Sequence, residues 1–423
     1  MHDNSSNALT RGARAGWLTV ATCFLMALFA WGTGFYAHGI YLIEIQKHTG
    51  WSTSFIASVV TGHYLLSALL LMGVADAMDR LGPRTVVLSA TALQAIGLAL
   101  LPLVEQRWQL VAIYGLFALA WTGMSSVPIA TLVGRWFERR RGLALNLALS
   151  GATAAGILIA PALLYLNATR GFAQATQWLA LAMLALLGPA VLMLVRWPAP
   201  GERELERLNG AASGTRGPSQ MPAPTRRQVL RRSDFWSIAA AFALALLVQV
   251  GFLTQQVAVL RGALTDAQIG LAIALTTGSA LVGRIGMAML IDRIDQRRAS
   301  ALAFISQAAA LMAIASTQAA PALLAACVVY GFSVGNVITL AALIVQKEFA
   351  PQVYGTVVGL TTGIGQLTYS FGPAVFGWLR DTFGGYRAPL VVGVVLYGVA
   401  AILIVSRGPG HRPRTQPASP GRP

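Results

Sequence analysis

The sequence has few charged residues and almost no lysine. Asp, Glu, Lys and Arg make up 11% of the 423 residues, and only Lys47 and Lys347 are lysines. A soluble chain of this length would form about three domains, and a soluble domain is about one quarter charged. So little charge cannot cover three polar surfaces, while 56% of the residues are hydrophobic. The composition excludes most soluble folds and predicts that apolar side chains face lipid.

Cysteine and the common nucleotide and metal motifs are also scarce. The two cysteines, Cys23 and Cys327, lie far apart inside apolar runs, which excludes a disulfide framework and a Cys-based metal spacing. No G-x-x-x-x-G-K-S/T loop occurs, so ATP-driven activity has no support. No nucleophile–base pair or cluster of metal ligands emerges from the spacing. We therefore expect no enzyme, no cofactor and no bound metal.

Long apolar runs are abundant instead. A membrane helix needs about 20 apolar residues, and twelve runs meet this need, near 17–42, 52–76, 84–104, 108–134, 143–166, 174–195, 235–260, 267–291, 299–317, 321–345, 354–379 and 387–406. The longest polar stretch, rich in Gly, Ser and Pro, divides them six and six. The predicted organisation is an N-terminal tail (1–16), a six-helix bundle (17–195), a linker (196–234), a second six-helix bundle (235–406) and a C-terminal tail (407–423).

The basic residues predict how the chain is oriented. Cytoplasmic loops are enriched in Lys and Arg. The tails and even-numbered connections hold 24 of these residues and the odd-numbered connections hold 6. Both tails and the linker are therefore expected in the cytoplasm, and the net charge of +16 indicates topology rather than nucleic-acid binding. The Arg-rich usage and lack of sorting motifs favour a bacterial inner membrane.

The two halves contain an internal repeat. Asp79 and Arg80 follow the second run, and Asp292 and Arg293 follow the eighth run, 213 residues later. Parallel repeats around a site near the membrane midplane are a recurrent plan of transporters, in which one half rocks against the other.

Specific residues in these repeats resemble a known family. Asp79, Arg80, Gly82 and Arg84 resemble the Asp-Arg-x-Gly-x-Arg signature of the major facilitator superfamily. GWSTS at 50–54 and RWFERRRGLALNLALSG at 135–151 resemble the branch of oxalate:formate antiporters and monocarboxylate porters. The resemblance implies an all-α membrane protein of twelve helices in two six-helix bundles. It also implies transport by alternating access.

Arg284 is the strongest candidate for a binding residue. It lies within the eighth run, where an ionised guanidinium is costly and normally faces a partner or a wet cavity. No Asp or Glu lies at mid-depth of any run, so a substrate carboxylate would supply the missing counter-ion. One fixed cation favours a monoanion over a dicarboxylate. The alternative role of Arg284 is a structural clamp on backbone carbonyls. The resemblance implies that a basic residue at this place pairs with a substrate carboxylate.

Further candidates lie in the other runs. Spans that line the central cavity in the superfamily carry Tyr36, Trp121, Asn336 and Gln366, which we expect to contact substrate or, alternatively, to bond between helices. His38 and His63 are candidates for proton coupling because histidine titrates near physiological pH. Each could instead be a neutral ring bonded between helices.

Acidic residues beside arginine on the cytoplasmic side predict pairing, because topology alone has little use for acids. The predicted network resembles the superfamily's conformational latch and comprises Asp79, Arg80, Arg84, Arg139, Arg140, Asp292 and Arg293.

The sequence thus predicts a secondary active transporter of a small monocarboxylate anion, working by proton symport or by anion exchange. Its partners would be the organic anion, the lipid bilayer and, in symport, protons, but no nucleic acid, and it is expected to be a monomer. The alternative function is proton-coupled efflux of drugs or amphipathic metabolites. That function normally needs an acid in the cavity, and no such acid lies at mid-depth.

Overall fold

The computed structural model describes residues 2–137, 140–198, 226–290, 294–349 and 354–406, and every regular element in these ranges is helical. The helices before the linker are α1 (His2–Trp31), the π-helix η1 (Gly32–Tyr36), α2 (His38–Thr49), α3 (Thr53–Leu71), α4 (Val74–Leu81), α5 (Pro83–Leu100), the short 3-10 helix η2 (Leu101–Leu103), α6 (Arg107–Met124), α7 (Ser126–Trp136), α8 (Arg141–Arg170) and α9 (Phe172–Leu194). Those after it are α11 (Arg226–Leu230), α12 (Ser233–Leu260), α13 (Asp266–Leu290), α14 (Gln296–Ser316), α15 (Ala320–Val334), α16 (Val337–Glu348), α17 (Tyr354–Ser370), α18 (Gly372–Phe383) and α19 (Arg387–Val405).

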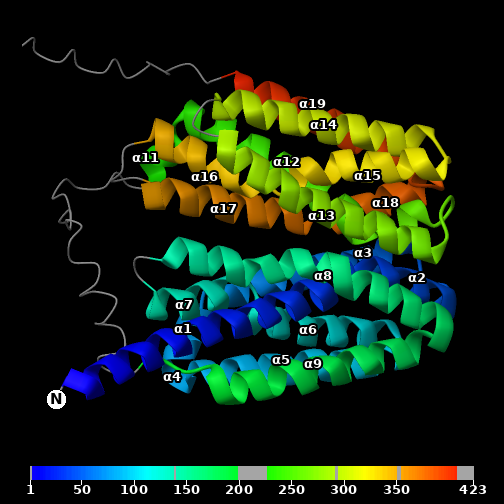
Figure 1. The fold of residues 1–423 in the computed structure, drawn as a ribbon. Coiled ribbons are helices and arrows are strands. Elements are labelled where there is room, and N and C mark those ends of the chain that lie inside the picture. Colours follow the sequence, from blue (N-terminus) through cyan, green and yellow to red (C-terminus); the bar gives the residue numbers. More distant parts are fainter. Residues whose placement is uncertain (1, 138–139, 199–225, 291–293, 350–353, 407–423) are drawn as a thin grey trace, which may run out of the picture.

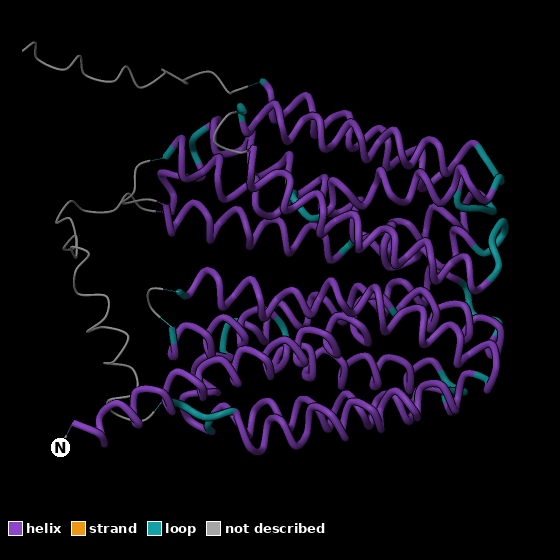
Figure 2. Tube along the Cα trace, in the orientation of Figure 1, coloured by secondary structure: helices purple, strands orange, loops and turns teal. Residues whose placement is uncertain are grey.

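The helices form two groups that lie side by side (Figure 1). We call α1–α9 the first bundle and α11–α19 the second bundle. Most loops lie at the two ends of the helices (Figure 2). We call the end at which α1 begins, which also holds α4 and α11, the N-terminal face, and the other end the opposite face. The bundles touch each other mainly through α8 with α13, α3 with α18 and α2 with α12.

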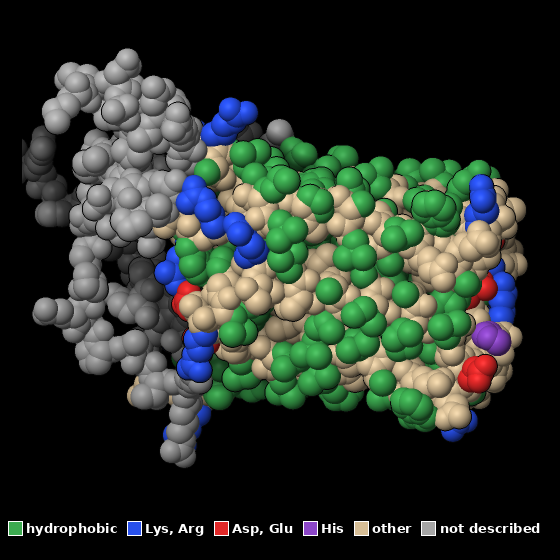
Figure 3. Space-filling model, turned by 90° about the horizontal axis from the view of Figure 1, so that it is seen from below, with side chains coloured by type: hydrophobic (Ala, Val, Ile, Leu, Met, Phe, Trp, Pro, Cys, Tyr) green, Lys and Arg blue, Asp and Glu red, His purple; other side chains and the backbone are tan. Residues whose placement is uncertain are grey.

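The outside of the molecule suits a membrane. Ten described helices are long and apolar enough to cross one. Large apolar side chains on them are exposed, such as Leu69 at 68% and Ile402 at 71%. Figure 3 shows hydrophobic side chains along the middle of the molecule and Arg and Lys at both ends. This distribution places the apolar belt against lipid and the guanidinium groups near water.

Four of the predicted runs are interrupted near mid-depth. The first contains the π-helix η1, the fourth breaks at Ser125 between α6 and α7, the tenth at Gly335 and Asn336, and the eleventh at Phe371. The last two breaks leave helices shorter than 18 residues, which is why ten rather than twelve long spans are found. Irregular backbone inside a membrane is tolerated only where protein buries it or it lines a cavity, and broken helices commonly mark transporter sites.

Candidate functional site

Arg284 is held beside the break of the tenth run. It lies six residues before the end of α13, roughly 9 Å from that end at 1.5 Å per residue. Its Nε donates to the carbonyl oxygen of Gly335 at 3.3 Å, and its side chain remains partly exposed. No acidic side chain of the described ranges forms an ion pair with Arg284. The guanidinium therefore has donors available beyond this one carbonyl contact.

Glycines bring the backbone of α15 close enough for this contact. A side chain on Gly283 would collide with the backbone of Phe332, and one on Gly335 would collide with the carbonyl of Ala280. The close packing of α13 against α15 thus sets the Gly335 carbonyl within reach of Arg284. Small residues permit such approach between membrane helices.

Tyr36 and Asn336 lie near Arg284 but differ in what their polar groups do. Tyr36, at the end of η1, is close enough to Arg284 for an electrostatic interaction across the two bundles. Asn336 is 2% exposed, and its Nδ2 donates to the carbonyl of Phe332 at 3.2 Å. That bond satisfies a carbonyl of α15 at the helix break, so Asn336 serves the break through its amide nitrogen.

Trp121 belongs to a group of six aromatic side chains that we call the aromatic wall. Their rings form a continuous chain of contacts, with centroids 4.9 to 6.4 Å apart. A side chain on Gly34 would lie 2.9 Å from the Trp121 ring, so the glycine in η1 makes room for it. The wall consists of Trp31, Phe35, Tyr36, Tyr64 and Trp121 of the first bundle and Tyr369 of the second.

Gln366 stands one helical turn before Tyr369 on α17, and both side chains are partly buried. Residues three apart share a helix face. The structure therefore puts Gln366 on the face of α17 that meets the aromatic wall.

The two candidate histidines lie together behind the aromatic wall. The ring centroids of His38 and His63 are 5.5 Å apart, and both side chains are at most 2% exposed. The hydroxyl of Tyr114 lies 3.4 Å from His38 Nδ1, whereas His38 Nε2 and both nitrogens of His63 lack a geometric hydrogen-bond partner in the described ranges. The backbone of Tyr114 is also close to the His63 ring.

A cavity of about 310 Å³ lies beside this histidine pair, between α3 and α6. Its lining is mostly apolar and comprises Ser58, Val59, Gly62, His63, Leu66, Val111, Tyr114 and Gly115. The structure thus brings the two histidines together within the first bundle. The aromatic side chains Tyr64 and Trp121 contact His63 on the way to the rest of the wall.

The N-terminal face carries two charge clusters. In the first bundle, Arg135 of α7 donates to both carboxylate oxygens of Asp79, at 2.8 and 3.0 Å, and Arg84 Nε donates to the carbonyl of Val195 at 3.3 Å. Arg80 and Arg140 are exposed. Arg139, Asp292 and Arg293, which we also predicted in this network, lie outside the described residues.

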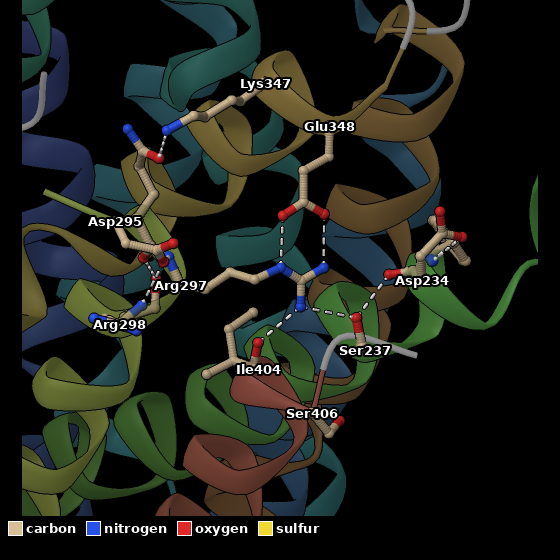
Figure 4. Close-up of polar contacts among 12 residues, drawn as sticks. Asp234, Ser237, Asp295, Arg297, Arg298, Lys347, Glu348, Ile404 and Ser406 are labelled. Atoms are coloured by element: carbon tan, nitrogen blue, oxygen red, sulfur yellow. Dashed lines mark hydrogen bonds and ion pairs between the residues drawn. The ribbon is translucent and has the colours of Figure 1, made fainter. Parts of the chain in front are cut away.

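In the second bundle, Arg297 of α14 forms two bonds to Glu348 of α16, at 2.6 and 2.7 Å (Figure 4). Its Nη1 also donates to Ser237 Oγ at 3.0 Å and to the carbonyl of Ile404 at 2.7 Å. The cluster therefore joins four helices, namely α12, α14, α16 and α19.

Several residues of these arrangements were missed from the sequence. The repeat carried the signal for the charge clusters, because 213 residues separate Arg84 from Arg297 and Arg135 from Glu348. For the aromatic wall, Trp31 and Phe35 are four residues apart, a spacing that puts them on one helix face.

The two bundles are bonded to each other toward the opposite face. Arg261, after α12, lies 3.5 Å from Glu44 of α2. The amide of Ser54 donates to Asp381, and the amide of Ala374 donates to Thr61 Oγ1 at 3.1 Å. In the described part of the chain, every hydrogen bond between the bundles belongs to this set.

Known proteins share this architecture. The model of the Major Facilitator Superfamily matches residues 22–373. Monocarboxylate transporter 11 of Mus musculus is 27% identical over 411 residues, covering 89% of this chain and 84% of the relative. The aspyridones efflux protein of Emericella nidulans is 24% identical over 422 residues, covering 95% and 80%. A bacterial homologue of the human lysosomal transporter Spinster, solved inward-facing and unoccupied, aligns with a TM-score of 0.68 at 12% identity, covering 93% of this chain and 97% of that one.

Proposed function

The chain belongs to the Major Facilitator Superfamily, and from this premise we propose that it carries a small monocarboxylate anion. As a member of the family it is an integral multi-pass membrane protein and a secondary transporter, not an enzyme. The observation that carries the proposal is Arg284, a partly exposed guanidinium inside a membrane helix with no ion pair to a described acid. A carboxylate could accept two parallel bonds from it.

The surroundings of Arg284 support an anion with one charge. The Gly335 carbonyl occupies Nε, which leaves the remaining donors of the guanidinium for the cargo. A second carboxylate would need a second cation at low dielectric. Tyr36 lies near the guanidinium from the other bundle, so a bound anion would contact both halves of the transporter.

The transport cycle follows from this arrangement. Binding between the bundles and rocking of one bundle against the other would expose the site to each side in turn. The bonds at the opposite face, including Glu44–Arg261, must break when that face opens. We further propose a monomer in a bacterial inner membrane, with the N-terminal face in the cytoplasm, because Arg and Lys are concentrated in the tails, the linker and the even-numbered connections.

Two modes of coupling fit the proposal. In proton symport, His38 and His63 would carry the proton, because they are buried together and three of their four ring nitrogens lack a geometric hydrogen-bond partner in the described ranges. In anion exchange, the empty carrier would not return and the histidines would be structural.

The experiment is uptake into proteoliposomes with a panel of labelled monocarboxylates at fixed voltage. Arg284→Ala should lower the apparent affinity by about 10- to 100-fold, the value of a charge-assisted bond. Arg170→Ala, at an exposed position at the end of α8, is the matched control and should transport normally. Unchanged kinetics in Arg284→Ala would contradict the site.

The same vesicles separate the coupling modes. Uptake into empty vesicles that an inward proton gradient stimulates would establish symport, and His63→Gln should abolish the stimulation. Uptake only into preloaded vesicles would establish exchange.

Efflux of an amphipathic compound is the second candidate, favoured by the 24% identity to the aspyridones efflux protein. Export of neutral or cationic compounds that is independent of Arg284, with no transport of any acid, would replace the first proposal with this one.

A further inference from the structure

The aromatic wall is a large uncharged surface next to the one cation of the proposed site. Tyr36 belongs to both, because it interacts electrostatically with Arg284 and its ring lies 5.2 Å from that of Phe35. From there the wall continues through Tyr64, 6.4 Å from Phe35, to Trp121.

The wall faces the junction between the bundles. Trp31, Phe35 and Tyr36 are partly exposed, although α1 is covered by α8, α9 and α7 on its other sides. The ring of Tyr369, from the second bundle, lies 6.2 Å from that of Tyr64. Rings on both sides of the junction are therefore available to a molecule whose carboxylate is bound at Arg284.

The chemistry of the wall selects among acids. Aromatic side chains bury large apolar areas and prefer stacked or edge-to-face contacts with other rings. An acid of two or three carbons has little surface to place against them. Ring faces also attract quaternary ammonium groups, but a second positive charge beside Arg284 would be repelled, since no described acid pairs with that arginine.

We infer that the cargo is an aryl-substituted monocarboxylate, whose carboxylate binds Arg284 and whose aromatic ring packs against the aromatic wall. This inference rests on the proposed function, because it specifies the body of the anion that Arg284 would bind. The extent of the wall across α1, η1, α3, α6 and α17 is what a short aliphatic acid would leave unused.

The test is isothermal titration of the purified full chain in detergent, which avoids passive permeation of weak acids. The probes are phenylacetate, cyclohexylacetate, propionate and glycine betaine. Phenylacetate should bind at least about tenfold more tightly than propionate, with cyclohexylacetate between them. Equal or tighter binding of propionate, or tightest binding of glycine betaine, would overturn the inference.

Variants connect this preference to the wall. Trp31→Leu and Tyr369→Leu, one from each bundle, should each reduce the ratio of phenylacetate to propionate affinity by roughly three- to tenfold. Trp108→Leu, at a site 65% exposed near the start of α6, is the control and should keep the ratio. An unchanged ratio in both wall variants would refute the inference. If no acid binds, or Arg284→Ala binds all acids as before, the proposed function itself fails.

Discussion

The charge clusters of the two bundles occupy repeat-related positions but differ in burial and in the direction of their charges. Arg297 is 3% exposed and Glu348 13%, whereas Arg135 and Asp79 are 44% and 49% exposed. The position 213 residues after Arg135 is Glu348, so the basic and acidic partners are exchanged between the halves. One repeated backbone therefore supports two different kinds of ion pair.

The difference predicts different energetic roles. Breaking a buried pair leaves an uncompensated charge in a low dielectric. An exposed pair gains little, because water and salt screen it. We therefore expect the Arg297–Glu348 cluster to hold four helices of the second bundle together permanently, and the Asp79–Arg135 pair to form and break at little cost.

The largest effect should come from Glu348→Ala. This change leaves Arg297 buried with only Ser237 and Ile404 as acceptors, and should cost about 3–5 kcal/mol of stability. Cys23 in the first bundle and Cys327 in the second are both buried, so thermal unfolding can be followed by a thiol-reactive dye in single-cysteine versions of the protein.

The Cys327 reporter should show a larger fall in unfolding temperature than the Cys23 reporter. Replacing both partners by apolar residues, Arg297→Met with Glu348→Leu, is the control and should recover most of the loss. Equal falls at the two cysteines would show that the cluster does not act on the second bundle in particular.

A smaller effect is expected from Arg297→Lys. Lysine keeps the charge but loses the planar fork that reaches Glu348, Ser237 and Ile404 together, at a cost of about 1–3 kcal/mol. The measurement is again unfolding reported by Cys327. Arg298→Lys, one residue along α14 at an exposed position, should have no comparable effect.

Asp79→Asn should have a still smaller effect, at most about 1 kcal/mol, because both partners are nearly half exposed. Unfolding reported by Cys23 in low and high salt would measure it, and the difference between variant and parent should shrink in high salt. A loss as large as that of Glu348→Ala would remove the contrast between the two clusters.

The smallest effect is expected from Arg135→Glu in the Asp79→Asn background. It gives the first bundle the same order of basic and acidic positions as the second, with Arg84 as the basic partner. Because these sites are exposed, stability reported by Cys23 should stay within about 1 kcal/mol of the Asp79→Asn parent. A large gain would mean that sequence order alone, rather than burial, makes the strong cluster.

The sequence predicted the helical membrane fold, because long apolar runs have few alternatives in lipid. The repeat around Asp79 and Arg80 also directed attention to the correct ends of the helices. It did not identify Glu348 as the partner of Arg297, since two residues 51 positions apart are joined only by the packing of α14 against α16.

The breaks near mid-depth were not predicted either. Ser125 and Phe371 follow apolar sequences that would continue as helices on local preference alone, and tertiary packing overrides that preference. The positions of Tyr36, Trp121, Asn336 and Gln366 near these breaks therefore became visible only in three dimensions. Their roles in binding stay predictions.

The contact of α8 with α13 includes a place where the two helices cannot come closer, because a side chain on Gly156 would collide with Thr277. Both residues lie near the middle of their helices. A rigid lever that turns about a point halfway along its length moves its two ends in opposite senses. A bundle pivoting at Gly156 would thus narrow one mouth as it widens the other, so that a through-leak is prevented by leverage and needs no separate moving door.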